Sequence, residues 1–327
     1  MNYSEKLNRL YKRQNPFSTS SYSQIFSSAN ESVKDEFYEA QEYAKRAMDE
    51  LPKRSTEISY EEGERVKSHL KDELPIYGFN PTFRYQGSVP CRTHIKYHSD
   101  IDLLVIIDKF ETCENVARVR NPYHGNPIKD LEQLRAACIK ILKENYTVAD
   151  VEKHAKSIKI SGGSLRRQID VVPSNWYNTE SWYQYNQEFY RGIQILNSKE
   201  RQRIKNYPFL NIHLIDEKDS RTSFRYRPLV RLAKTLKEDA DVPINISSYD
   251  IQALFYNMDD TWFQADVNNL VYSASKYLYK LKNNARIYGS LEVPDKTRKI
   301  SDNVGISEIE KLFKEFYDLY SQLNGLR

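Results

Sequence analysis

The chain has 327 residues, 29% of them charged, with 49 Lys and Arg against 45 Asp and Glu and a net charge of +4. Its mean hydropathy is −0.74, and its longest unbroken apolar run, Leu103 to Ile107, is far shorter than the ~20 residues of a membrane-spanning helix. These values exclude a bundle of membrane-spanning helices and predict a soluble protein long enough for two lobes. The charges are mixed along the chain, which fits a nucleotide pocket better than a long nucleic-acid-binding surface.

The cysteines and the N-terminal residues bear on the compartment. Cys91, Cys113 and Cys138 are widely spaced, odd in number and outside any Cys-x-x-Cys or Cys/His cluster. A structural zinc site is therefore not expected. The first residues lack the apolar block of a secretory leader. We expect a cytoplasmic protein in a reducing compartment, with no membrane partner.

Two helices are predicted before the first strand. Apolar residues recur at helical spacing between residues 32 and 51, and Pro52 would end that helix. Ser59-Tyr60-Glu61-Glu62 has the form of a capping box, which predicts a second helix from there to about Leu74. Because this helix leads directly into a strand pattern at residues 82–87, we expect it to pack behind that strand as a spine.

Strand patterns then dominate up to residue 195. The predicted strands are residues 82–87, 101–107, 156–161, 166–172 and 188–195, and a helix over residues 131–144 interrupts them. Ser161-Gly162-Gly163-Ser164 separates two of these patterns and predicts a hairpin turn. It is not a Walker phosphate loop, because no Gly-Lys-Ser or Gly-Lys-Thr follows.

From about residue 200 the pattern becomes helical. Basic and polar residues from 199 to 227 predict a long solvated connection, and the helices predicted to follow it are residues 228–237, a helix from Ser247 or Ser248, 262–283 and 307–323. Ser307 and Glu310 form a second candidate capping box. We therefore expect two domains: a mixed α/β lobe over residues 1–200, which includes the N-terminal helices, and a helical lobe over residues 201–327.

Three aspartates on two predicted strands are the candidate catalytic residues. Asp100 and Asp102 are two residues apart and share one face of their strand, with apolar residues on the other. Asp170 lies on a later strand and shares its face with Gln168. Neighbouring carboxylates repel each other unless a cation lies between them, and Mg²⁺ takes such oxygen ligands. Two metals held by three carboxylates would clamp the attacking and leaving oxygens of a phosphoryl transfer.

A Gly-Ser pair completes the pattern. Eleven residues separate Gly87-Ser88 from Asp100, and the pair offers backbone N–H groups and a hydroxyl where a phosphate could bind. A lone Asp-x-Asp is weak evidence, because most such pairs are solvated strand edges or turns. The full series of Gly-Ser, Asp-hydrophobic-Asp and a later Asp is far more specific.

With these residues the chain resembles the nucleotidyltransferases of the polymerase-beta superfamily. More narrowly, it resembles the bacterial cyclic-oligonucleotide synthases (CD-NTases) related to cyclic GMP-AMP synthase and the oligoadenylate synthases. The matching segments are Gly87-Ser88, Asp100/Asp102, Asp170, Leu229–Lys234 and Ser247–Ile251. The resemblance covers most of residues 30 to 290. It departs at Gln86, where the broad motif often has an apolar residue.

The resemblance implies an α+β, bilobal, polymerase-beta-like fold with the active site in the cleft between a sheet lobe and a helical lobe. It implies that the three aspartates hold two Mg²⁺ ions, which Mn²⁺ can replace, and that Asp170 helps to deprotonate the acceptor hydroxyl. Gly87 and Ser88 would bind donor phosphates. Lys234 would reach the same phosphates, although a solvated lysine is the plain alternative. Ser248 would bond a phosphate and Tyr249 would stack on a base; a tyrosine that simply packs in the core is an equal alternative.

The implied activity is Mg²⁺-dependent joining of nucleoside triphosphates (ATP, GTP or pyrimidine nucleotides) into a cyclic di- or trinucleotide, with release of pyrophosphate. The resemblance also implies that the cyclic product is a second messenger in bacterial anti-phage defence, which a separate effector protein reads. Cyclisation rests on the resemblance alone.

Three alternatives stay open from the sequence. The first is a transferase that makes linear oligonucleotides or modifies an RNA or protein end. The second is an inactive nucleotide-binding module, against which the intact set of three acids argues. The third is a DNA-activated sensor like the animal enzyme, but the cysteines and histidines of this chain do not supply that enzyme's zinc-bearing insertion. We therefore expect no obligatory activation by DNA.

Overall fold

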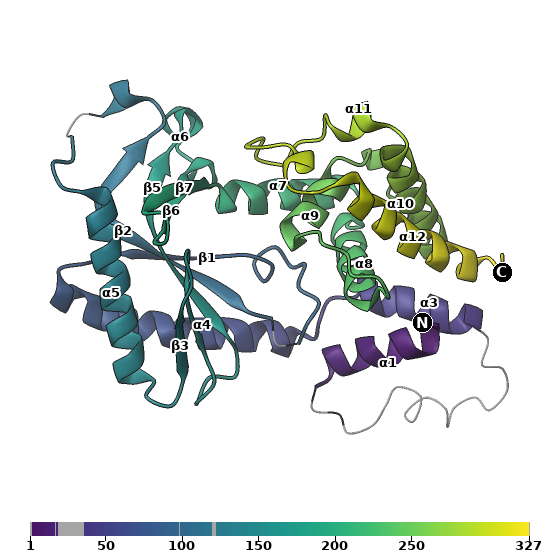
Figure 1. The fold of residues 1–327 in the computed structure, drawn as a ribbon, viewed down its shortest axis with the longest axis horizontal. Coiled ribbons are helices and arrows are strands. Elements are labelled where there is room, and N and C mark those ends of the chain that lie inside the picture. The colour runs from purple at the N-terminus through teal and green to yellow at the C-terminus, as the bar shows by residue number, and fades with distance from the viewer. Residues whose placement is uncertain (1, 17, 19–35, 98, 120–121, 327) are drawn as a thin grey trace. The chain divides into compact units, whose positions relative to one another are not determined.

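The computed structural model describes residues 2–16, 18, 36–97, 99–119 and 122–326 (Figure 1). The chain forms two compact units. The sheet unit comprises Pro52–Cys91 and His98–His213, and the helical unit comprises Met1–Leu51, Arg92–Tyr97 and Leu214–Arg327. This division differs from the expected boundary at residue 200, because the N-terminal helices belong with the C-terminal ones.

The sheet unit contains one mixed sheet of seven strands, ordered β1-β2-β5-β4-β3, with β6 pairing β5 and β7. The strands are β1 (Thr82–Gln86), β2 (Ile101–Cys113), β3 (Asp150–Lys153), β4 (Ile158–Ser161), β5 (Ile169–Asn178), β6 (Gly192–Asn197) and β7 (Gln202–Asn206). Among the strand pairs of the described residues, only the central one, β2 with β5, is parallel; the others are antiparallel. The expected mixed α+β arrangement is confirmed.

Two helices cover one face of this sheet. They are α4 (Lys53–Glu73) and α5 (Pro127–Asn145). The sheet unit also contains four shorter helical segments, which are η1 (Leu74–Tyr77), η2 (Val116–Arg118), α6 (Glu180–Tyr185) and η3 (Glu188–Tyr190). Val66 and Leu70 of α4 pack in one core with Leu103 of β2, which is fully buried. Alternation along a strand places every second residue on this face. The spine helix predicted behind the site is therefore present.

The opposite face of β2 and β5 carries a second, smaller core. Leu104 and Ile106 pack there with Val172 of β5, and the other buried members of the cluster are Trp176, Ile193 and Ile195. Because residues of one parity share a face, the side chain of Asp102 lies on the same face as this cluster, just before it along β2.

The helical unit joins both ends of the chain. Its helices are α1 (Tyr3–Gln14), α3 (Glu36–Met48), α8 (Tyr226–Asp239), α9 (Ser248–Tyr256), η4 (Asp260–Trp262), α10 (Val267–Lys282), α11 (Ala285–Tyr288), η5 (Ile300–Asp302) and α12 (Ile306–Leu323), and α7 (Pro208–Arg221) crosses the division between the units. Arg13 of α1 forms two 2.9 Å hydrogen bonds to the buried Asp239 carboxylate of α8. The Tyr43 hydroxyl of α3 donates to the same carboxylate at 2.9 Å. This buried cluster explains why the N-terminal helices belong to the helical unit.

Several predicted boundaries are wrong, for local reasons. The helix expected to open at Ser59 already begins at Lys53, so Ser59 lies inside it and its hydroxyl donates to the Ser55 carbonyl. Helix α12 follows an N-cap glycine, Gly305, without a side-chain cap, so the second capping box is absent. The connection expected over residues 199–227 contains β7, α7 and the start of α8.

The predicted start of the helix at Ser247 or Ser248 is confirmed. Ser247 caps α9, its side chain accepting from the Asp250 N–H. The predicted start of the first helix, residues 32–35, lies outside the described residues. Within the described part of the chain, no helix is both long and apolar enough to cross a membrane.

Candidate active site

The sheet brings Asp102 and Asp170 into adjacent positions on its two central strands. Asp102 of β2 is the register partner of Asp170 of β5 in the parallel ladder, and Gln86 of β1 is the partner of Asp102 on the other side. Residues directly opposite each other on neighbouring strands project to the same face, with their side chains in reach of one another. Two acids distant in sequence therefore become neighbours through strand pairing alone.

Asp100 lies immediately before β2, and two polar side chains orient the flanking carboxylates. The Gln168 amide donates to Asp100 Oδ2 at 3.0 Å, and the Ser157 hydroxyl donates to Asp170 Oδ1 at 3.0 Å. Gln168 was predicted to share the face of Asp170, whereas Ser157 was missed. A serine in a polar loop before a strand carries no signal in the sequence, and only the fold places it against an acid.

The three carboxylates interact electrostatically. The pKa of the Asp102 carboxyl is raised from 3.8 to about 7, first by burial and then by the negative charges of Asp170 and Asp100. A carboxylate that is pushed toward its neutral form by neighbouring acids lacks a compensating positive charge. Such a site gains from a bound cation.

Gly87 is required by the position of Asp102. Its φ is +88°, in the left-handed region, and a Cβ at this position would lie 2.1 Å from Asp102 Oδ2. A side chain there would have to displace the Asp102 carboxylate and adopt a strained backbone conformation, so glycine lets the turn lie directly against the carboxylate. Ser88 follows in the turn and is partly buried. The predicted phosphate-binding pair and the predicted acids thus form one cluster.

The donor set of this cluster fits a hard divalent cation. It offers carboxylate oxygens, the ligands that Mg²⁺ prefers, around a charge that burial leaves uncompensated. The positions of these side chains do not yet form such a site, because among the described residues no group of three or more His, Cys, Asp or Glu side chains is arranged so that it could hold a metal ion. Asp100 accepts a hydrogen bond from Gln168 and Asp170 accepts one from Ser157, and neither of these donors carries a charge that would neutralise the acids.

The remaining predicted residues lie in the helical unit. Lys234 of α8 is buried, and its ammonium donates to the Thr93 carbonyl at 2.6 Å. Ser248 is the exposed first residue of α9. The Tyr249 hydroxyl donates to Asp295 at 3.0 Å, and burial together with Asp295 raises the pKa of this tyrosine.

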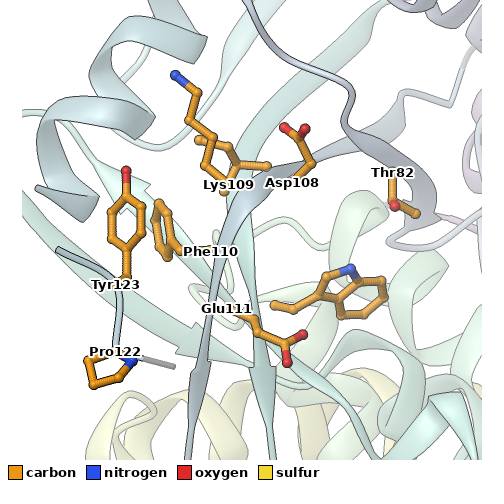
Figure 2. A pocket seen from close by; sticks show the side chains of 9 residues that line it. Thr82, Asp108, Lys109, Phe110, Glu111, Pro122 and Tyr123 are labelled. Carbon is orange, nitrogen blue, oxygen red and sulfur yellow. The ribbon is translucent and has the colours of Figure 1, made fainter. Parts of the chain in front are cut away.

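A cavity of about 480 Å³ lies at the other end of β2 (Figure 2). The rings of Phe110 and Tyr123 stack there with centroids 5.0 Å apart, and Asp108 and Glu111 also line it. It contains none of the predicted site residues, so the candidate active site is the acid cluster.

The parallel pair that carries Asp102 and Asp170, flanked by the strand that ends directly before Gly87, gives the sheet the arrangement of a polymerase-beta-like nucleotidyltransferase. Residues 213–322 match the family model of the cGAS/DncV-like nucleotidyltransferase C-terminal helical domain. A c-di-GMP synthase of Capnocytophaga granulosa is 34% identical, over 99% of this chain and 98% of its own length. A cyclic dinucleotide synthase, CdnE, of Yersinia aleksiciae is 36% identical over 78% of this chain and 68% of its own length.

Solved structures agree. The structure of the STING-associated CdnE c-di-GMP synthase from Capnocytophaga granulosa matches with a TM-score of 0.81 and 32% identity, over the full length of both chains. That of a STING-associated CdnE c-di-GMP synthase from Flavobacteriaceae sp. matches with a TM-score of 0.83 and 26% identity, over 100% of this chain and 99% of the other. The chain belongs to the cGAS/DncV-like nucleotidyltransferases, the CD-NTase family, and is a nucleotidyltransferase.

Proposed function

We propose that this enzyme joins two molecules of GTP into cyclic di-GMP and releases two molecules of pyrophosphate. The observation that carries the transfer chemistry is the cluster of Asp100, Asp102 and Asp170 against the Gly87 turn. The choice of guanine and of a two-membered ring rests on the relatives named c-di-GMP synthases.

In each transfer, a ribose hydroxyl of the acceptor attacks the α-phosphorus of the donor. The new bond is the phosphodiester P–O bond, and the bond between the α-phosphorus and the α,β-bridging oxygen breaks. Asp170 accepts the hydroxyl proton, and pyrophosphate leaves with the bonding electron pair. A second transfer on the same pair of nucleotides closes the ring.

The chain's own groups bind and orient the donor. Backbone N–H groups of the Gly87 turn and the hydroxyl of Ser88 bind its β- and γ-phosphates, because such a turn directs donors toward an anion. Asp100, Asp102 and Asp170 would hold two Mg²⁺ ions, which Mn²⁺ can replace. When bound, these ions would neutralise the charge that develops on the attacking and leaving oxygens.

The helical unit would supply the base contacts. Tyr249, whose ring centroid lies 5.6 Å from the Arg298 guanidinium, would stack on a base. Its hydroxyl bond to Asp295 fixes the ring, and Ser248 bonds a phosphate. Lys234 would bind a phosphate only by exchanging its bond to the Thr93 carbonyl.

We further propose that the product is a second messenger in anti-phage defence in the bacterial cytoplasm, read by a separate effector protein. Two relatives described as STING-associated support the existence of such an effector. Activity would not require DNA.

The test is incubation of the purified protein with labelled ATP, GTP, CTP and UTP and with Mg²⁺ or Mn²⁺, without nucleic acid, followed by mass spectrometry. A phosphatase-resistant product with the mass of cyclic di-GMP supports the proposal. Phosphatase-sensitive chains would indicate linear synthesis. The absence of pyrophosphate release at every pH would indicate an inactive binding module, and release only with added DNA would indicate a sensor.

A further inference from the structure

One row of side chains runs across five strands of the sheet. Strand pairing aligns Gln86 with Asp102, Asp102 with Asp170, Asp170 with the lysine of β4, and that lysine with a glutamate of β3. Directly paired residues share a face. In order from β1 to β3 the row is therefore Gln86, Asp102, Asp170, Lys159 and Glu152.

The row has a donor side and an acceptor side. Gln86 is followed directly by the Gly87-Ser88 turn, the proposed site for the donor phosphates, so the donor lies toward β1. Asp170 is the acid proposed to receive the proton of the acceptor hydroxyl. The position beyond Asp170, away from the donor, is thus the acceptor side, and it is occupied by Lys159.

Lys159 is placed to bind an anion. Its side chain is 27% exposed, and its ammonium lies 3.9 Å from a carboxylate oxygen of Glu152. That separation is at the outer limit of an ion pair, and such a partly exposed pair contributes little to stability. The ammonium can therefore move to a stronger anion without a large cost to the fold. Lysine suits this role because it is a compact charge on a flexible stem.

We propose that Lys159 binds the 5′-phosphates of the acceptor nucleotide and so positions its ribose hydroxyl over Asp170. This inference rests on the proposed function, and it assigns the second nucleotide to the β4 side of the acids. Glu152 holds the ammonium until the acceptor arrives.

The test compares two acceptors that differ in their phosphates. Trace α-labelled GTP serves as donor, and the acceptor is either GDP or guanosine, neither of which carries a pyrophosphate leaving group. The rate of formation of labelled linear dinucleotide is measured against acceptor concentration, which gives a KM for each acceptor. The variants are Lys159→Met, Lys159→Arg and the matched control Lys153→Met. Lys153 is an exposed lysine of β3 that projects to the opposite face from Glu152.

Loss of a phosphate contact should raise the KM for GDP about 10-fold in Lys159→Met, the size expected for a hydrogen bond to a charged group. The KM for guanosine should change less than about two-fold, since guanosine lacks the phosphates that the lysine would bind. Lys159→Arg should restore most of the affinity for GDP, and Lys153→Met should match the wild type.

An equal loss with both acceptors, or no loss with either, would overturn the assignment, because a merely structural lysine cannot distinguish them. If Lys159→Met does not fold, as judged by its melting temperature, Lys159→Gln gives the same comparison. Failure of the wild type to form any dinucleotide would instead overturn the proposed function, and this inference with it.

Discussion

Replacing Asp102 by asparagine should stabilise the metal-free protein at pH 8. The native carboxyl has its pKa raised from 3.8 to about 7 by burial and by two neighbouring acids. Between these two pH values the native protein binds more protons than the unfolded chain, so the free energy of unfolding falls as the pH rises. Above pH 7 the whole loss is present. Asparagine at this position carries no charge at any of these pH values, so the variant does not suffer this loss of stability.

The size of the gain follows from the two pKa values. At about 1.4 kcal/mol per pH unit, the interval from 3.8 to about 7 gives an upper limit of about 4 kcal/mol. The Asp102 side chain keeps some contact with solvent, which screens its neighbours. We therefore expect a gain of about 2 kcal/mol at pH 8 and less than half of that at pH 5.

Urea denaturation in EDTA at pH 5 and pH 8 measures this difference directly. Asp108→Asn is the matched control, because Asp108 is an exposed acid near the other end of the same strand. A variant Asp102→Asn that is equally stable or less stable than the wild type at pH 8 would refute the reasoning. So would a gain of the same size at both pH values, because it would not come from a titrating carboxylate.

Three further predictions concern the site. The double substitution of Asp100 and Asp102 by asparagine should abolish turnover and keep the native circular dichroism spectrum; normal turnover would refute the metal assignment. Gly87→Ala should lose more than about 10-fold in kcat/KM, because its Cβ would clash with Asp102. The control Gly78→Ala has a similar φ of +76° but open space around it, so it should keep its activity and lose only the ~1 kcal/mol of stability that a strained backbone costs. Equal activity losses in the two variants would contradict this. Tyr249→Ala should raise KM for nucleotide more than it lowers kcat, and an unchanged KM in steady-state kinetics would exclude stacking.

The site residues of the sheet unit follow from short-range patterns. Alternation around Asp102 and Asp170 shows which acids face away from a core, and strand pairing in a mixed sheet then brings the two together. The helix behind them was predicted from the capping pattern at Ser59 and from its place directly before β1, and it is present although it begins earlier, at Lys53. The face of each acid and the place of that helix depend on spacing within ten or twenty residues, which a single sequence displays, whereas the pairing of β2 with β5 joins residues far apart in the chain.

Contacts between distant segments could not be predicted in the same way. Ser157 meets Asp170 only because β4 pairs with β5, and Lys159 reaches the acid row for the same reason. The N-terminal helices join the helical unit through Asp239, more than 190 residues from Tyr43. Ser59 shows the opposite failure: a local capping pattern lost to a helix that had already begun at Lys53.

The most direct test of the acid cluster is a crystal structure with Mn²⁺ and a GTP analogue that cannot react. We predict anomalous density for manganese in contact with Asp100, Asp102 and Asp170, and triphosphate oxygens against the Gly87-Ser88 turn. Manganese bound away from these three carboxylates, or a nucleotide bound elsewhere on the chain, would contradict the proposed chemistry.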